Sequence, residues 1–329
     1  MRGGRGVKVL GTGSFAPERR LTNDDLSRMV DTSDAWIVER TGVRERRIAA
    51  AETTASDLAS EAAKRALEAA ELGPEDLDMI VFATSSPDRI VPASAVYLQK
   101  KLGAFNAGAV DNLAACSGFV YAFTSGASMV ASGTSERCLV VGGEVLSKIT
   151  DYQDRTTCIL MGDAAGAVVL GPSEDGSDVL YAKMRADGRL EDFIIVPASG
   201  YATPPTDEAR EKRQTYIRMK GREVYKFGVP KFVEAIRDAL AACEMTLEDL
   251  DLLIPHQMNL RMIEAVAERL PFPMSRVLVN IQKYGNTSSA SIPLALDEAV
   301  RGGRIRRGDR ILLTAMGAGL TWGTIVLRW

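Results

Sequence analysis

The single histidine of this 329-residue chain marks a candidate centre for its chemistry. Histidine is the side chain best suited to proton transfer or enolate stabilisation near neutral pH. His256 follows the apolar run 252–255, whose composition predicts a buried strand that ends at this residue. A histidine in that place can also be an ordinary capping residue. As the only histidine present, it carries any such catalytic role alone.

Two further segments carry residues that suit thioester chemistry. Cys116 lies in Ala-Ala-Cys-Ser-Gly before a run of small residues that predicts a helix, and backbone N–H groups at a helix N-terminus favour a thiolate. Asn286 lies in Tyr-Gly-Asn-Thr-Ser before another apolar run. Taken singly, the cysteine fits a buried structural residue and the asparagine a turn with a helix cap. With His256 they indicate a thiol nucleophile served by a His and an Asn, which forms carbon–carbon bonds on thioesters.

Composition narrows the class of protein. The length suits one large α/β domain or two closely packed ones. Forty basic against 43 acidic residues give a net charge of −3, which excludes a general nucleic-acid binder. The four cysteines are not paired closely enough for a metal or disulfide framework. Residues 1–6 do not resemble a secretory signal, and no apolar run reaches the roughly 20 residues of a membrane span, so we expect a cytoplasmic enzyme without a metal.

The elements that must position these residues occur twice. Apolar runs at 7–10, 79–83, 138–142 and 165–170 predict buried strands, and 55–72 and 119–132 predict helices. Segments around 66–78 and 137–140 recur 173 residues later, at 239–251 and 310–313. We therefore expect two copies of one α/β unit, joined near 172–178. Equivalent strand ends of the two copies can then meet, with Cys116 from the first copy and His256 and Asn286 from the second.

Several longer motifs, in order along the chain, resemble the ketoacyl-acyl-carrier-protein synthase III family, the initiating condensing enzymes of type II fatty-acid synthesis. They are residues 11–17, 32–38, 40–46, 162–163, 220–226, 255–257, 285–288 and 319–323. The resemblance runs essentially from end to end. It implies an α/β thiolase fold, a five-layered α-β-α-β-α stack built from two duplicated βαβαβαββ halves. We place the halves at 1–174, with the nucleophilic cysteine, and 175–329, with the histidine and asparagine.

The resemblance also implies the reaction. Cys116 takes an acyl group from acyl-CoA, malonyl-acyl-carrier protein loses carbon dioxide, and the enolate attacks the acyl-cysteine to give 3-ketoacyl-acyl-carrier protein. His256 and Asn286 would donate hydrogen bonds to the enolate oxygen. A CoA thioester is then a substrate, and no cofactor is bound permanently. The implied partners are acyl-CoA, malonyl-acyl-carrier protein and a second copy of the chain in a homodimer, with no nucleic acid or membrane.

The other site residues follow from the same resemblance. The backbone N–H groups of Cys116 and Ala318 would form the oxyanion hole, and Lys226 and Arg261 would contact the carrier protein. The acyl pocket would be lined by Val91, Leu160 and Met161. The expected CoA-binding residues are Trp36, Arg40, Arg155, Gly221, Tyr225, Asn259 and Arg261.

The chain departs from the family pattern at four of its positions. Val91 and Met161 stand where phenylalanine is common, Met258 where alanine is common, and Ala318 where glycine is common. The smaller valine and the adaptable methionine lead to the hypothesis that the primer range extends beyond acetyl to short branched or medium acyl chains. A backbone donor at Ala318 survives the change if its conformation suits an L-residue.

Other functions fit parts of the sequence. A starter ketosynthase or an acyltransferase of secondary metabolism would share the fold, although pure acyl transfer does not need Asn286. A non-catalytic subunit would be expected to lack Cys116, and a thiolase would need a second cysteine after Cys243. A synthase of branched hydroxy-methylglutaryl thioesters needs a catalytic glutamate, for which Glu144 is the nearest candidate.

Overall fold

Two β-sheets organise the chain in the computed structural model, which describes residues 4–175 and 178–329. Residues 1–3 of the N-terminal segment and 176–177 of the expected linker lie outside the described residues. The first sheet has the order β1-β7-β6-β4-β5, with β1 (Val7–Phe15), β4 (Met79–Ala83), β5 (Gly108–Asn112), β6 (Cys138–Val145) and β7 (Asp163–Pro172). The second has the order β11-β12-β13-β8, with β8 (Asp178–Ala186), β11 (Leu252–Pro255), β12 (Arg310–Gly317) and β13 (Thr321–Arg328).

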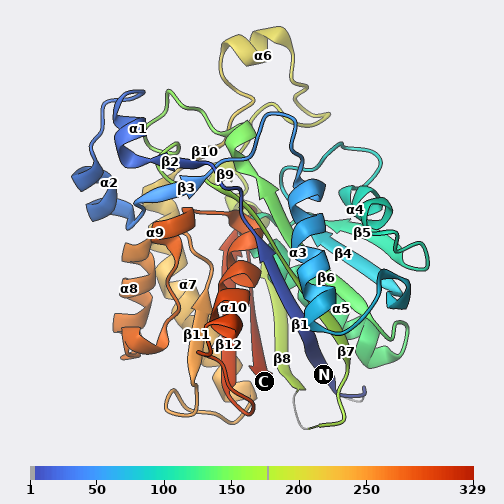
Figure 1. Ribbon diagram of the computed structural model, residues 1–329. Helices are drawn as coiled ribbons and strands as arrows, with labels where there is room; N and C mark the ends of the chain where they lie inside the picture. The colour runs from blue at the N-terminus through green and yellow to red at the C-terminus, as the bar shows by residue number, and fades with distance from the viewer. Residues whose placement is uncertain (1–3, 176–177) are drawn as a thin grey trace.

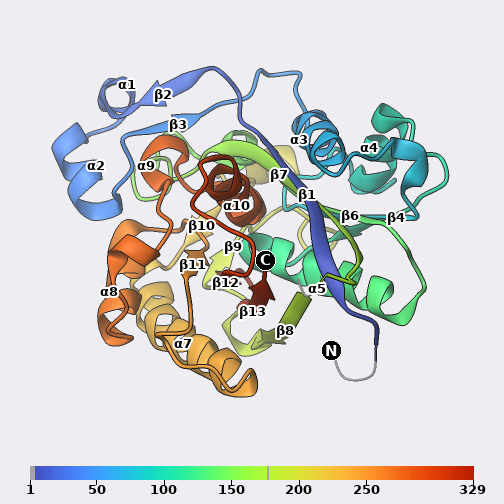
Figure 2. The same ribbon diagram turned by 60° about the horizontal axis from the view of Figure 1, so that its bottom comes forward.

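Helices form three layers around these sheets. The outer face of the first sheet carries α3 (Ala55–Ala69) and α4 (Ser94–Leu102), and that of the second carries α7 (Gly221–Ala242) and α8 (Leu260–Arg269). Between the sheets lie α5 (Gly118–Ser132) and α10 (Ser291–Arg301). Figure 2 shows the two outer pairs on opposite sides of the molecule. This arrangement confirms the predicted five-layered α-β-α-β-α stack.

The alternation of side chains along each strand produces the layers. In β6, Cys138 and Val140 face the core between the sheets, whereas Leu139 and Val141 face the outer helices. Every residue of β6 is buried, as expected for a strand covered on both faces. The sheet can approach α5 closely because Gly126 has no side chain: a Cβ there would lie 2.8 Å from the sulfur of Cys138.

The duplication is visible in the structure. The same shift of 173 residues relates the first residues of β4 and β11, and those of α5 and α10. The copies differ at the edge of the sheet, where the counterpart of β5 is reduced to an isolated bridge between Leu253 and Val277. The second sheet is therefore one strand shorter than the predicted repeat. All strands of the first sheet lie within residues 1–174, and those of the second within 175–329.

Smaller elements surround the end of the stack where β4 and β11 finish. A cap is formed by α1 (Asn23–Ser27), α2 (Asp34–Thr41), β2 (Arg20–Thr22) and β3 (Glu45–Arg47), beside α9 (Ile281–Tyr284) (Figure 1). The 3-10 turns are η1 (Pro74–Asp76), η2 (Ala115–Ser117), η3 (Leu146–Ile149), η4 (Gly188–Leu190), η5 (Met274–Arg276) and η6 (Ser288–Ala290). Among the helices in the described ranges, none combines the length and apolar character needed to span a membrane.

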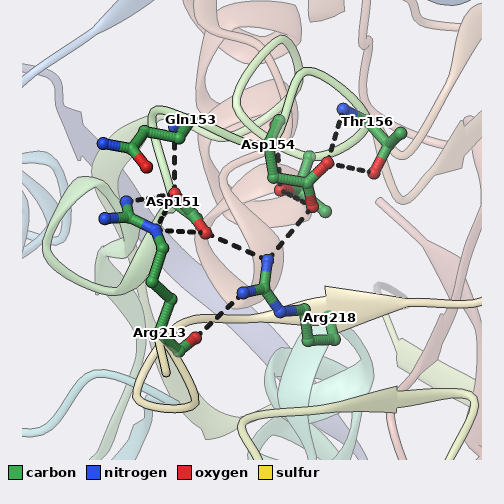
Figure 3. Close-up of polar contacts among 7 residues, drawn as sticks. Asp151, Gln153, Asp154, Thr156, Arg213 and Arg218 are labelled. Carbon is green, nitrogen blue, oxygen red and sulfur yellow. Dashed lines mark hydrogen bonds and ion pairs between the residues drawn. The ribbon is translucent and has the colours of Figure 1, made fainter. Parts of the chain in front are cut away.

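A flap, residues 196–217, protrudes from this end and carries α6 (Asp207–Glu211) (Figure 1). It connects β9 (Ile194–Ile195) to β10 (Arg218–Met219). An ion-pair cluster holds its base (Figure 3). Nε of Arg213 donates to both carboxylate oxygens of Asp151 at 2.9 Å, and Nη1 of Arg218 lies 3.0 Å from Asp151 and 3.4 Å from Asp154. Hydrogen bonds from Arg213 are the main reason that the pKa of the buried Asp151 is lowered to about 2.

Candidate active site

Cys116, His256 and Asn286 line one cavity of about 130 Å³. The cysteine comes from the first half of the chain and the other two residues from the second, as the duplication predicts. The remaining lining residues are Leu160, Ile194, Met219, Gly221, Val224, Tyr225, Met258, Asn259, Met262 and Met316. The cavity thus combines a thiol and three nitrogen-bearing side chains, those of His256, Asn286 and Asn259, with a mostly apolar wall.

Cys116 lies in η2, directly before α5, and is partly exposed to the cavity. The turn presses against β12, because a Cβ on Gly317 would lie 2.6 Å from the backbone nitrogen of Cys116. Burial raises the pKa of the Cys116 thiol to about 11. This opposes the expectation from the helix N-terminus, since desolvation of the sulfur outweighs the donors around it. The free enzyme therefore holds a neutral thiol at pH 7.

His256 follows β11 directly, as predicted, and is buried. Its Nδ1 lies 2.7 Å from the hydroxyl of Ser291 at the start of α10. This contact orients the ring and leaves Nε2 for the cavity. Burial lowers the pKa of the imidazole to about 3, so the ring is neutral over the physiological range. When Ser291 donates to Nδ1, the proton of the neutral ring is on Nε2, which can then donate to a substrate oxygen.

Asn286 is held on three sides by backbone groups. Its N–H donates to Leu160 at 2.7 Å, its carbonyl accepts from Gly162 at 3.0 Å, and its side-chain Oδ1 accepts from the N–H of Ser288 at 2.8 Å. The Nδ2 group is left to donate into the cavity. Gly285 is required here, because its φ is +67° and a Cβ would lie 2.4 Å from the carbonyl oxygen of Leu160.

The three predicted acyl-pocket residues have different surroundings. Leu160 lines the cavity, and the buried Met161 forms a bridge with Asn286. Val91 is 77% exposed and does not line the cavity. Two of the three residues are therefore close to the candidate catalytic groups, whereas Val91 lies on the surface of the chain.

The predicted nucleotide-binding residues form a cluster beside the cavity. The guanidinium carbons of Arg40 and Arg155 lie 4.6 and 5.2 Å from the ring centroid of Trp36. Nδ2 of Asn259 donates to the carbonyl of Arg40 at 3.0 Å, so a cavity residue is joined directly to the cluster. An aromatic face next to two exposed guanidinium groups suits an adenine ring and phosphates.

The remaining predicted residues lie around the cavity. Gly221 and Tyr225 line it, and Lys226 and Arg261 are exposed, in the second turn of α7 and the first turn of α8. Ala318 follows Gly317 and has a negative φ, so an L-residue fits there without strain.

Sequence reasoning missed five apolar residues of the wall: Ile194, Met219, Val224, Met262 and Met316. They come from β9, β10, α7, α8 and β12, and apolar residues in such elements look like ordinary core. Three had a neighbouring signal, since Met219 directly precedes the 220–226 motif, Val224 lies within it, and Met316 begins the C-terminal glycine cluster.

Comparisons with known proteins place this geometry in context. The protein-family model for 3-oxoacyl-[acyl-carrier-protein] synthase III matches residues 110–188. The family model for the C-terminal part of that synthase matches residues 240–329. Beta-ketoacyl-[acyl-carrier-protein] synthase III of Caldanaerobacter subterraneus subsp. tengcongensis is 50% identical over 321 residues, which cover 98% of this chain and 97% of that protein.

Solved structures agree with these matches. The crystal structure of 3-oxoacyl-[acyl-carrier-protein] synthase III from Aquifex aeolicus VF5 has a TM-score of 0.92 and 48% identity, covering 98% of this chain and 100% of that one. The priming beta-ketosynthase of the R1128 polyketide biosynthetic pathway has a TM-score of 0.90 and 35% identity, covering 98% and 96%.

Proposed function

The chain belongs to the 3-oxoacyl-[acyl-carrier-protein] synthase III family, and we propose that Cys116, His256 and Asn286 carry out its condensation reaction. The predicted thiolase fold and the activity of a beta-ketoacyl-acyl-carrier-protein synthase III, an acyltransferase that initiates fatty-acid synthesis, are confirmed by these relatives. The observation that carries the residue assignment is the meeting of one thiol with two free N–H donors in one cavity.

In the first half-reaction, the sulfur of Cys116 attacks the thioester carbonyl of acyl-CoA. The carbonyl oxygen becomes an oxyanion, which the backbone N–H groups of Cys116 and Ala318 would stabilise. The bond from the carbonyl carbon to the CoA sulfur breaks, and the thiol proton ends on that sulfur. Because the raised pKa of Cys116 disfavours a free thiolate, loss of the thiol proton would be coupled to attack.

In the second half-reaction, malonyl-acyl-carrier protein loses carbon dioxide, and the electron pair of the broken bond forms a thioester enolate. Nε2 of His256 and Nδ2 of Asn286 would donate to the enolate oxygen, with no proton transfer. A neutral imidazole suits this role, because it donates without carrying a charge. The enolate carbon then attacks the acyl group on Cys116, and the carbon–sulfur bond breaks to release 3-ketoacyl-acyl-carrier protein. The bond's electron pair stays on the Cys116 sulfur, which takes a proton from solvent to restore the neutral thiol.

We propose that CoA binds as a substrate only, with its nucleotide at Trp36, Arg40 and Arg155. The pantetheine would follow the cavity past Asn259 and Tyr225. Lys226 and Arg261 are exposed cations near the cavity mouth, which suits contact with an acidic carrier protein.

The primer range is proposed to extend beyond acetyl. Met161 beside Asn286 and the wall methionines Met219, Met258 and Met316 are adaptable side chains that can accommodate different acyl groups. Comparing acylation by acetyl-, isobutyryl- and octanoyl-CoA tests this, and exclusive use of acetyl-CoA would contradict it.

We also propose a homodimer formed through β5. Among the strands of the described residues, β5 pairs only with β4, so its other edge has unpaired backbone groups. Large apolar side chains are exposed nearby, including Phe105 at 73% and Leu113 at 76%. Leu113 is three residues from Cys116, so a covering partner would lie close to the cavity. Val91 is too exposed in one chain to line an acyl pocket, and its proposed role depends on this dimer.

The expected cellular location is the cytoplasm, where CoA thioesters and acyl-carrier proteins are available. A role in starter-unit selection for a polyketide is the second candidate, because the priming ketosynthase of the R1128 pathway shares 35% identity over almost the whole chain. Asn286 is expected in both enzymes, since both perform decarboxylative condensation.

Intact-protein mass spectrometry tests the residue assignment. The protein is mixed with an acyl-CoA and then with malonyl-acyl-carrier protein. We expect an acyl adduct on Cys116 that disappears as the 3-ketoacyl product forms, and no adduct in Cys116→Ser. An adduct that persists in the presence of malonyl-acyl-carrier protein would support an acyltransferase and refute the enolate roles of His256 and Asn286.

A further inference from the structure

Glu144 in β6 is a buried carboxylate whose partners come from both halves of the chain. Its Oε1 accepts from the hydroxyl of Ser289 at 2.8 Å, and its Oε2 from the hydroxyl of Ser86 at 2.6 Å. The N–H of Ser85 donates to both oxygens, at 3.1 and 3.0 Å. Burial raises the pKa of the Glu144 carboxyl, and the hydrogen bonds from Ser86, Ser289 and Ser85 oppose that shift. The catalytic scheme above does not use this residue.

The turn η6 also contacts the same face of β6 at a second position, Gly142. Gly142 lies two residues before Glu144, so both point to one side of the strand. A Cβ on Gly142 would lie 2.2 Å from the carbonyl oxygen of Ser289, which means that the turn contacts the strand backbone directly. Gly142 therefore gives η6 room to pack against β6, and Glu144 ties it in place.

The duplication makes η6 the equivalent of η2, the turn that carries Cys116. The shift of 173 residues relates η6 to η2, and their first residues, Ser288 and Ala115, have similar left-handed φ values of 48° and 46°. Ser289 is then the counterpart of Cys116, and Glu144 is the counterpart of the Gly317 that packs against the nucleophile. The second copy of the nucleophile turn carries a serine bound to a carboxylate where the first carries the free thiol.

This second turn orients the asparagine. The N–H of Ser288 donates to Oδ1 of Asn286 at 2.8 Å, which leaves Nδ2 to face the cavity. Ser288 is the direct chain neighbour of Ser289. If Ser289 were released from β6, the donor that fixes the amide plane of Asn286 would move with it.

We propose that Glu144 is a positioning residue for decarboxylative condensation: by holding Ser289 it fixes the Ser288 N–H, and through it the amide of Asn286. The inference rests on the proposed role of Asn286. It does not make Glu144 a base for the nucleophile. Burial is the main cause of the raised pKa of Cys116, and the Glu144 charge adds to it whereas the Ser288 hydroxyl opposes it, so this carboxylate works against a thiolate.

The test separates the two half-reactions in Glu144→Ala and Ser289→Ala. We expect acylation of Cys116 by acyl-CoA to stay within about threefold of the parent, and decarboxylative condensation to fall by about tenfold to 100-fold. Ser289→Ala removes one hydroxyl and so serves if the glutamate variant does not fold. The matched control is Asp297→Ala, because Asp297 is also buried, accepts from two hydroxyls and from Nε of Arg301, and does not line the cavity. The ratio of its acylation rate to its condensation rate should equal that of the parent.

A conservative variant adds a rescue. Ser289 can donate to the carbonyl of Ala83, which lies 2.9 Å away, and accept from an amide, so Glu144→Gln can keep the turn in place. We expect Glu144→Gln to recover condensation to within about tenfold of the parent.

Asn286→Ala, measured in parallel, separates failure of the proposed role of Asn286 from failure of the proposed role of Glu144. If it condenses normally, the proposed function of Asn286 fails. If it loses condensation while Glu144→Ala and Ser289→Ala retain it, only the positioning inference is overturned. Equal losses of acylation and condensation in the Glu144 and Ser289 variants would also overturn it, because that result indicates a general structural role.

Discussion

Replacing Asp151 by asparagine removes the charge that joins the flap to the body of the protein. The side chain keeps its size and can still accept from the N–H of Gln153 at 2.9 Å. What is lost is the ionic interaction with Arg213 and Arg218 (Figure 3). The variant therefore measures the electrostatic contribution of this cluster to folding.

The size of this electrostatic contribution follows from the shifted pKa of Asp151. Hydrogen bonds from Arg213, with smaller contributions from the N–H of Gln153 and from Arg218, lower the pKa of Asp151 from 3.8 to about 2. A tenfold change in an equilibrium constant corresponds to about 1.4 kcal/mol, so the ionised form stabilises the fold by about 2 kcal/mol at pH 7. Because the folded pKa is depressed, this stability is present above pH 3.8 and is lost as the pH falls toward 2. At pH 3 about half of it should remain.

The assay is thermal and urea unfolding of both proteins at pH 7, 5, 4 and 3. We expect Asp151→Asn to unfold about 3 °C below the parent at pH 7, with a gap that narrows between pH 4 and pH 3. Asp207→Asn is the control, since this α6 residue forms only an exposed ion pair with Arg210 and should change little. Equal stability of Asp151→Asn and the parent at pH 7, or a gap that is unchanged at pH 3, would refute the reasoning.

Three further predictions concern binding, assembly and acylation. Trp36→Ala should raise the KM for acyl-CoA about tenfold in steady-state kinetics and leave the acylation rate at saturation unchanged; a lower saturated rate would place the ring at the chemistry instead. Phe105→Glu should give a monomer by light scattering, whereas Tyr201→Glu, on the exposed flap, should not; a dimeric Phe105→Glu would exclude the β5 surface. Gly317→Ala should slow acylation about 100-fold in a rapid-quench assay, because its Cβ would lie 2.6 Å from the nucleophile's backbone nitrogen, while Gly188→Ala, with open space around it, should be unaffected.

Much of the fold was predictable because it depends on local patterns. The apolar runs at 79–83 and 138–142 became buried strands, and the repeated segments became equivalent elements. The positions of Cys116 and His256 at the ends of such elements could be predicted for the same reason. Asn286 could be singled out only together with Cys116 and His256, since alone it is indistinguishable from a helix-capping turn.

The remaining features depend on tertiary surroundings. Burial of the Cys116 sulfur, and hence its raised pKa, exists only in the folded cavity. In the sequence Val91 is an ordinary apolar residue, and the residues next to it do not indicate whether its side chain is buried or exposed in the fold. The partners of Glu144 come from positions 58 to 145 residues away in the chain, so spacing along the sequence does not indicate them.

The catalytic geometry depends on how closely the helices between the two sheets are packed. Cys116 lies directly before α5, and the Ser291 that contacts His256 begins α10, so the packing of these two helices sets the distance between the thiol and its donors. Gly126 lies in α5 about two turns from the helix start, against Cys138 of β6. A larger side chain there would widen the gap and misalign groups that it never touches. Tolerance to mutation in this core is therefore limited by catalysis as well as by stability.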